Sequence, residues 1–125
     1  MNKVIKVLVF LPAVLFLVMG LRWLVAPAGV APEFGLTLDH GLGLSTQIGD
    51  LSAFFLTTAI CMLIGLVTAN KTWFYPPMIL LSLTAVGRVI AWLIHDATLA
   101  TEQIGVEIVV SIILLIATYR LPARG

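Results

Sequence analysis

Four apolar runs constrain the fold of this chain more strongly than any other feature of its sequence. They cover residues 4–25, 51–69, 77–94 and 104–119. A helix needs about 20 residues, within a range of about 17–25, to cross the hydrocarbon core of a bilayer. Three runs reach this length, and the fourth reaches it if Glu102 and Gln103 begin its helix. We predict an all-α membrane protein, a single four-transmembrane-helix bundle over residues 1–125, with helices at about 4–25, 50–69, 77–95 and 103–120.

The composition excludes the main soluble classes. Hydrophobic residues make up 61% of the chain and charged residues 10%, with a mean hydropathy of +1.14. Average domains contain about 25% charged residues. The net charge of +1 supplies no basic face for nucleic acid. Cys61 is the single cysteine, and His40 and His95 are widely separated, so the sequence indicates no metal site and no cofactor.

The first run has an alternative interpretation as a secretory signal. Lys3 and Lys6 precede it, and the "APA" of Ala26–Ala28 resembles a cleavage site. The apolar stretch is longer than a typical signal core, however. We therefore expect it to be retained as the first membrane helix.

Charge and aromatic residues predict the orientation of the helices. Basic residues are enriched in cytoplasmic segments, and the basic residues outside the spans all fall on one side of a four-span topology: Lys3, Lys6, Lys71, Arg120 and Arg124. Acidic residues gather on the opposite side. Tryptophan and tyrosine mark both expected interfaces. These patterns place both termini in the cytoplasm.

The segment between the first two spans differs from an ordinary linker. Residues 26–49 are rich in glycine, yet they retain five large apolar residues: Phe34, Leu36, Leu38, Leu42 and Leu44. Such a segment is expected to fold back onto the helices. We predict a long outer loop that caps the bundle.

Small residues recur every four positions in the second span. They are Ala53, Thr57, Cys61, Gly65 and Ala69. Small residues at this spacing let two membrane helices approach closely. The stripe therefore predicts a helix-packing face, in which Cys61 is a packing residue rather than a reactive thiol.

Arg88 lies within the third apolar run. It is about 12 Å inside the end of the helix that Asp96 marks. A central arginine costs about 2.5–3.5 kcal/mol on insertion scales, so it needs a partner. Glu107 on the fourth span is the first candidate and Asp50 is the second. Arg22, near the outer surface, is expected to pair with Asp50 or Asp96.

Polar residues at helical spacing surround this arginine. Thr84, Arg88, Ala91 and His95 share one face of the third helix, and Gln103, Glu107, Ser111 and Thr118 share one face of the fourth. They predict an outward-opening polar pocket with an apolar floor. The candidate ligand-binding residues are Arg88, Glu107, Asp50, His95, Arg22 and Ser111. Two structural alternatives stay open: Arg88–Glu107 as an ion pair that fixes helix register, and His95 as a surface residue.

Short motifs along the chain resemble the DoxX-like superfamily of small four-helix membrane proteins. They are "GLRWLVAP", "EFGL", "GDLSAFF", "GR" and a fourth-helix glutamate. The matching positions are Gly20, Pro27, Phe34, Gly35, Gly49, Asp50, Gly87, Arg88 and Glu107. The resemblance implies a four-helix bundle in a bacterial cytoplasmic membrane. One member partners a quinone-reducing sulfur enzyme, but this chain lacks a cysteine pair or cofactor motif that would support the same role.

Three functions follow from these features. The first is a binding module for a small amphipathic molecule such as a quinone, an isoprenoid or a sterol-like lipid. The second is a structural or accessory subunit that docks a larger membrane partner or a second copy through the small-residue stripe. The third is a membrane-embedded isomerase with Glu107 and Asp50 as acid and base. A transporter is disfavoured because no broken helix is evident.

Overall fold

The computed structural model describes residues 3–120, and this part of the chain is helical apart from its connections. Four long helices follow the predicted spans, and three short elements lie between them. In chain order the elements are α1 (Lys3–Val25), α2 (Pro27–Val30), η1 (Ala31–Phe34), α3 (Gly41–Thr68), η2 (Lys71–Phe74), α4 (Tyr75–Ile94) and α5 (Thr101–Arg120). Four segments are long and apolar enough to cross a membrane. The prediction of an all-α, multi-pass membrane protein is confirmed. Arg124 lies outside the described residues.

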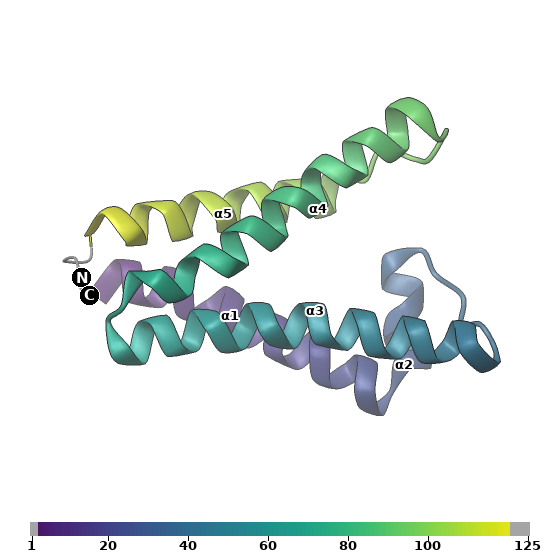
Figure 1. Cartoon of the computed structure of the whole chain (residues 1–125), viewed down its shortest axis with the longest axis horizontal. Helices are drawn as coiled ribbons and strands as arrows, with labels where there is room; N and C mark the ends of the chain where they lie inside the picture. The colour runs from purple at the N-terminus through teal and green to yellow at the C-terminus, as the bar shows by residue number, and fades with distance from the viewer. Residues whose placement is uncertain (1–2, 121–125) are drawn as a thin grey trace.

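The long helices form two antiparallel pairs (Figure 1). The α1 and α3 helices make the most extensive contact, and α4 packs mainly on α5. The two pairs converge at the end that carries both termini and η2, and they diverge toward the other end (Figure 1). The molecule is therefore an open V rather than a closed bundle.

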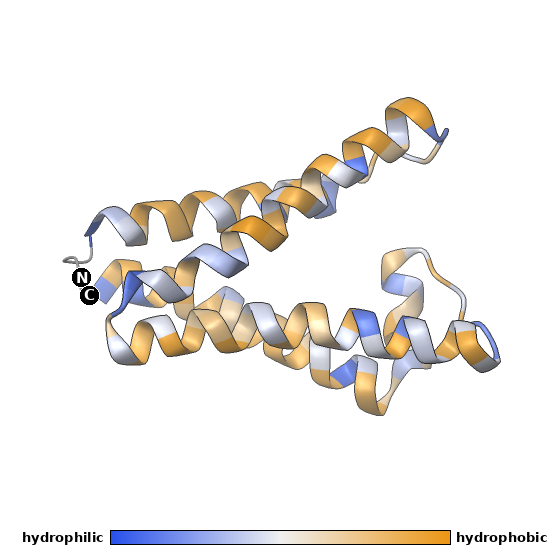
Figure 2. Ribbon diagram, viewed as in Figure 1, coloured by the Kyte–Doolittle hydropathy of each residue, from blue (hydrophilic) through white to orange (hydrophobic). Residues whose placement is uncertain are grey.

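The four long helices are apolar along most of their length (Figure 2). Large hydrophobic side chains such as Leu11, Leu21, Ile79, Leu83 and Ile112 are exposed. About half or more of the surface of each of these residues stays exposed, which would be costly in water and suits lipid contact. The exposed surface agrees with a membrane location.

The hydrophobic core lies where the two pairs converge. Its fully buried members come from all four long helices and from η2, and they include Val9, Met62, Phe74, Leu81 and Leu114. Pro77 is also buried at the start of α4, where a missing N–H is tolerated. This packing joins the two pairs at one end of the V, whereas buried residues such as Trp23 and Val30 continue the core along the α1–α3 side of the open end.

The α1 and α3 helices approach each other closely at Gly20. A Cβ atom added there would lie 2.6 Å from Leu56 Cγ and 3.1 Å from the Leu56 backbone nitrogen. These distances are shorter than ordinary van der Waals contact, so the absence of a side chain permits the packing. At this level a glycine of α1 faces Leu56 of α3, which is not a member of the predicted small-residue stripe.

The predicted small-residue stripe is divided between two environments. Cys61 and Gly65 are buried, and a Cβ atom at Gly65 would lie 2.5 Å from Cε1 of the Phe74 ring. Ala53 and Thr57 are exposed. The face of α3 that packs inside the chain is displaced around the helix and includes Ser52, Phe55, Thr58, Ala59 and Met62. That Ala53 and Thr57 contact another chain stays a prediction.

The α3 helix begins at Gly41, well before the predicted start near residue 50. The prediction gave too much weight to the glycines of this segment. Leu44, Ile48, Leu51 and Phe55 recur at helical spacing and are at least partly buried, so they continue the packed face of α3 outward. The other long helices match the expected bounds within two residues, which is the usual uncertainty of helix ends.

The segment between α1 and α3 packs on the outer half of these same two helices. The Trp23 and Phe34 rings lie 6.1 Å apart, and Phe34 and Phe55 lie 5.4 Å apart, measured between centroids. The Gln47 side chain donates to the Thr37 carbonyl and accepts from the Asp39 backbone N–H. The segment thus stands at the open end of the V, on the α1–α3 side.

Candidate functional site

Arg88 and Glu107 form an ion pair between α4 and α5. Arg88 Nε donates to both carboxylate oxygens, at 3.2 Å to Oε1 and 3.1 Å to Oε2. The Glu107 side chain is only 8% exposed, whereas that of Arg88 is 31% exposed. The predicted pairing is therefore confirmed. It satisfies a buried carboxylate with a charge-assisted contact from the neighbouring helix.

This pairing uses only one of the three nitrogens of the guanidinium. The two terminal Nη atoms of Arg88 have no hydrogen-bond partner among residues 3–120. Arginine presents five N–H donors in a planar fork, so four of them are left for another group. These donors lie beside a cavity, because Arg88 lines the space between the two helix pairs.

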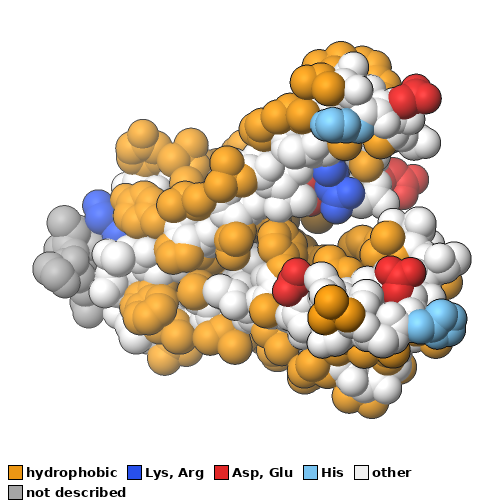
Figure 3. Space-filling view, turned by 45° about the vertical axis from the view of Figure 1, so that its right-hand side comes forward, with side chains coloured by type: hydrophobic (Ala, Val, Ile, Leu, Met, Phe, Trp, Pro, Cys, Tyr) orange, Lys and Arg blue, Asp and Glu red, His pale blue; other side chains and the backbone are white. Residues whose placement is uncertain are grey.

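The cavity is a cleft of about 360 Å³ at the open end of the V. Residues of α1, η1, α3, α4 and α5 line it. The polar lining residues are Arg88, Glu107, Glu33, Glu102 and Gln103. The space-filling view shows a hollow between the two helix pairs with basic and acidic side chains at its edges (Figure 3).

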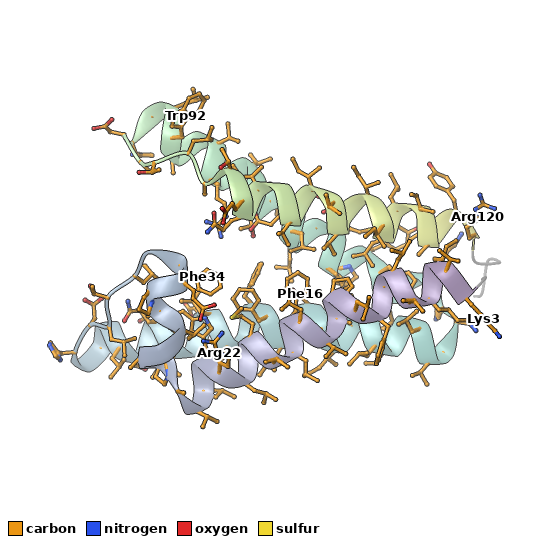
Figure 4. The ribbon with its side chains drawn as sticks, turned by 180° about the vertical axis from the view of Figure 1, so that it is seen from behind. Lys3, Phe16, Arg22, Phe34, Trp92 and Arg120 are labelled. Atoms are coloured by element: carbon orange, nitrogen blue, oxygen red, sulfur yellow. The ribbon has the colours of Figure 1, made fainter. Side chains whose placement is uncertain are left out.

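Aromatic and aliphatic side chains form the opposite wall and the floor of the cleft. Phe16 projects from α1 toward the α4–α5 pair (Figure 4). Its ring centroid lies 6.0 Å from that of Phe55, which also contacts Phe34. Leu81 of α4 closes the cleft toward the core. Of the residues on the two polar helix faces predicted to form a pocket, only Arg88, Gln103 and Glu107 line this cleft.

Arg22 pairs with Glu33, so the prediction of Asp50 or Asp96 as its partner is wrong. The α2 and η1 turns fold the chain back over the end of α1, and Arg22 Nη2 contacts Glu33 Oε2 there. The adjacent guanidinium holds the pKa of the Glu33 carboxyl below its ordinary value. The pair fastens η1, with Phe34 of the cleft wall, to α1.

Arg22 does not line the cleft, and three further candidate residues lie away from it. Asp50 and His95 are exposed on α3 and at the end of α4, and neither lines the cleft. Ser111 lines a separate groove of about 520 Å³ between α4 and α5, whose lining also includes Glu107. Its Oγ is buried and has no hydrogen-bond partner in the described part of the chain. The structure therefore joins Arg88 with Glu107 and leaves these three outside the cleft.

Sequence reasoning missed several residues of the cleft. Glu33 and Phe34 were assigned to the outer segment, and Phe16 and Phe55 looked like ordinary membrane-span residues. The position of Phe16 could have been predicted from helical spacing, because it shares the packed face of α1 with Ala13 and Gly20. The position of Glu33 could not, because it depends on a turn that sequence patterns do not specify.

The described residues contain no cluster of three histidine, cysteine or acidic side chains that could hold a metal ion. Comparisons with protein-family models, with curated proteins and with solved structures found no match for this chain. The fold and the cleft thus define its class by themselves. It is an all-α, multi-pass membrane protein with a charged cleft between two helix pairs.

Proposed function

We propose that this protein binds a small amphipathic molecule in the cleft between its two helix pairs. The polar head of the ligand accepts hydrogen bonds from Arg88, and its apolar body lies against Phe16, Phe34 and Phe55. The observation that carries this proposal is the one-sided pairing of Arg88. Its Nε is bound to Glu107, and its remaining donors stand beside the cleft without a partner among residues 3–120.

The dimensions and lining of the cleft support a small-molecule ligand. Ligand sites typically have volumes of about 300–1,000 Å³ and are largely apolar, with a few polar groups that fix orientation. A cleft of about 360 Å³ with three phenylalanines on one wall and an arginine on the other fits that description. A quinone, an isoprenoid or a sterol-like lipid belongs to the class of molecule that such a site accepts.

We further propose that the cleft opens on the outer side of a bacterial cytoplasmic membrane. Lys3 and Arg120 lie together at the closed end (Figure 4), and η2 with Lys71 is at the same end. Basic residues prefer the cytoplasmic side, which supports cytoplasmic termini. The assignment to bacteria and to the DoxX-like superfamily depends on the sequence resemblance alone. In this arrangement residues 26–40 act as the outer cap of a bound ligand.

A role as an accessory subunit is the second candidate. It is supported by the exposure of Ala53 and Thr57 on the outer half of α3, which leaves a small-residue face open to another membrane helix. The isomerase alternative lacks comparable support. Asp50 does not line the cleft that holds Glu107, so the two carboxyl groups do not surround one substrate.

Native mass spectrometry of the protein released in a neutral detergent, with extraction of bound small molecules, tests the proposal. We expect one defined molecule on the wild type. It should be lost from Arg88→Gln and from Leu15→Trp, which fills the cleft without removing a charge. The matched control Lys71→Gln removes a cation at the closed end and should retain the molecule. A wild type that carries only heterogeneous membrane lipid, equally in all variants, would refute ligand binding.

A further inference from the structure

The charges around the cleft bear on the chemistry of the ligand head, given the function proposed above. We infer that the ligand carries a positively charged amine or ammonium group, held near Glu102 at the mouth of the cleft. The inference rests on the proposed function, since it assigns the head group of the same ligand.

Carboxylates outnumber basic groups around the cleft. Glu33, Glu102 and Glu107 line it, and Arg88 is the one basic residue between positions 3 and 120 that does so. Arg22 compensates Glu33 from the end of α1, and Arg88 compensates Glu107. Glu102 is left with an uncompensated negative charge. The N-terminus of α5 contributes about half a positive charge at most, so the cleft stays negative.

Glu102 is free to act on a ligand. It belongs to the first turn of α5, is exposed, and lines the cleft. No hydrogen bond or ion pair joins its carboxylate to any residue between 3 and 120. The neighbouring amide of Gln103 also lines the cleft and is likewise unpaired within that range. The mouth therefore offers one carboxylate and one amide to an incoming group.

The positions of Glu102, Glu107 and Arg88 between the mouth and the floor of the cleft indicate how such a ligand lies. Glu102 is about 7 Å nearer the outer end of α5 than Glu107. A cation at Glu102 is then separated from the Arg88 guanidinium, which is itself held by Glu107. An oxygen of the same head can accept from the Arg88 Nη groups, while the apolar body extends toward Phe16 and Leu81.

An aromatic ring also lines the cleft in which the cation is proposed to lie. The Phe34 ring lines the cleft beside Glu33 and is only half-buried. A cation within about 6 Å of an aromatic ring face is attracted by the ring quadrupole. An anionic head would instead face the uncompensated charge of Glu102, while the charge of Arg88 is already balanced by Glu107. Charge complementarity therefore favours an ammonium head over a carboxylate or a phosphate.

Three probes with the same twelve-carbon chain test this inference: dodecylamine, dodecanol and dodecanoate. Each is titrated by native mass spectrometry onto the wild type, onto Glu102→Gln and onto Asp50→Asn, in a neutral detergent. Asp50→Asn is the matched control, because it removes an exposed carboxylate outside the cleft. We expect dodecylamine to bind the wild type most tightly. Its binding should weaken about fivefold in Glu102→Gln, the size of effect typical of an exposed ion pair.

The outcomes separate the inference from the proposed function. If dodecanol or dodecanoate binds as tightly as the amine, the assignment of a cationic head is wrong, but the cleft is still a ligand site. If the amine weakens equally in Asp50→Asn, general surface charge explains the preference and Glu102 has no specific role. If no probe binds and the extracted wild type carries no defined molecule, the proposed function itself fails.

Discussion

Arg88 Nε contacts both oxygens of Glu107, and this contact joins α4 to α5 beside the cleft that separates the two helix pairs. The pair serves two purposes in our account. It neutralises a nearly buried carboxylate, and it holds the guanidinium so that its terminal donors stand at the cleft. The two purposes can be separated experimentally, because stability depends on the balance of charge whereas binding depends on the arginine.

Replacing one partner of this pair should destabilise the protein more than replacing both. Arg88→Met leaves an unpaired carboxylate that is 8% exposed. Breaking such a pair from one side costs about 3–5 kcal/mol, whereas replacing the whole pair by apolar residues is often close to neutral. We expect thermal unfolding midpoints to fall in Arg88→Met and Glu107→Met and to recover in the double variant. Additive losses in the double variant would contradict a coupled pair.

Gly20→Ala should loosen the contact between α1 and α3. The added Cβ would lie 2.6 Å from Leu56 Cγ, and overpacking of this kind costs about 1–3 kcal/mol. That cost exceeds the gain of up to about 1 kcal/mol in helix propensity. Gly29→Ala is the matched control, because nothing lies within 4 Å of its added Cβ. Thermal unfolding in detergent should show a loss for Gly20→Ala and no loss for Gly29→Ala; equal effects would refute the close approach.

Glu33 should titrate below its ordinary pKa because Arg22 stabilises its charged form. A lowered pKa in the folded state means that the ion pair stabilises the fold at pH values above the ordinary 4.5 and is lost as the pH falls through the lowered value. The carboxyl chemical shift of Glu33, followed by NMR against pH, measures this. In Arg22→Gln the midpoint should rise toward the ordinary value. An unchanged midpoint in that variant would show that the pair does not persist in solution.

Opposite ends of the V should be accessible from opposite sides of the membrane. In a Cys61→Ser background, His40→Cys places a thiol at the open end and Thr72→Cys places one in η2 at the closed end; both native residues are exposed. A membrane-impermeant maleimide should label position 40 in intact cells and position 72 only after permeabilisation. The reverse pattern would invert the proposed orientation and place the cleft on the cytoplasmic side.

Length and hydropathy were sufficient to predict the four spans, because membrane-crossing helices satisfy their own backbone hydrogen bonds and need only enough apolar residues. The Arg88–Glu107 pair was also predictable, since a charge within a span requires a partner on a neighbouring helix. Both predictions depend on large free-energy costs within the membrane, one for unsatisfied backbone hydrogen bonds and the other for an unpaired charge. Such costs can be read from one residue and its immediate sequence context.

Two details could not be predicted in the same way: the partner of Arg22, and which side of the α3 helix packs inside the chain. Glu33 reaches Arg22 through the α2 and η1 turns, whose geometry depends on the packing of Phe34 against Trp23 and Phe55. Small residues on α3 would mark a close approach only where the facing side chains of α1 are large. Here the small residue at the contact is Gly20, and α3 contributes Leu56. Both details require tertiary structure.

The central claim is that the cleft, rather than the general lipid-facing surface, holds a defined small molecule. A photoreactive benzoylphenylalanine at Phe34, which lines the cleft, tests this directly against the same group at Trp92, which is exposed on α4 and directed away from the α1–α3 pair (Figure 4). Mass spectrometry after illumination in native membranes identifies the adducts. Our account predicts one small-molecule adduct of constant mass at position 34 and mixed membrane lipids at position 92. The same mixture of lipids at both positions would contradict it.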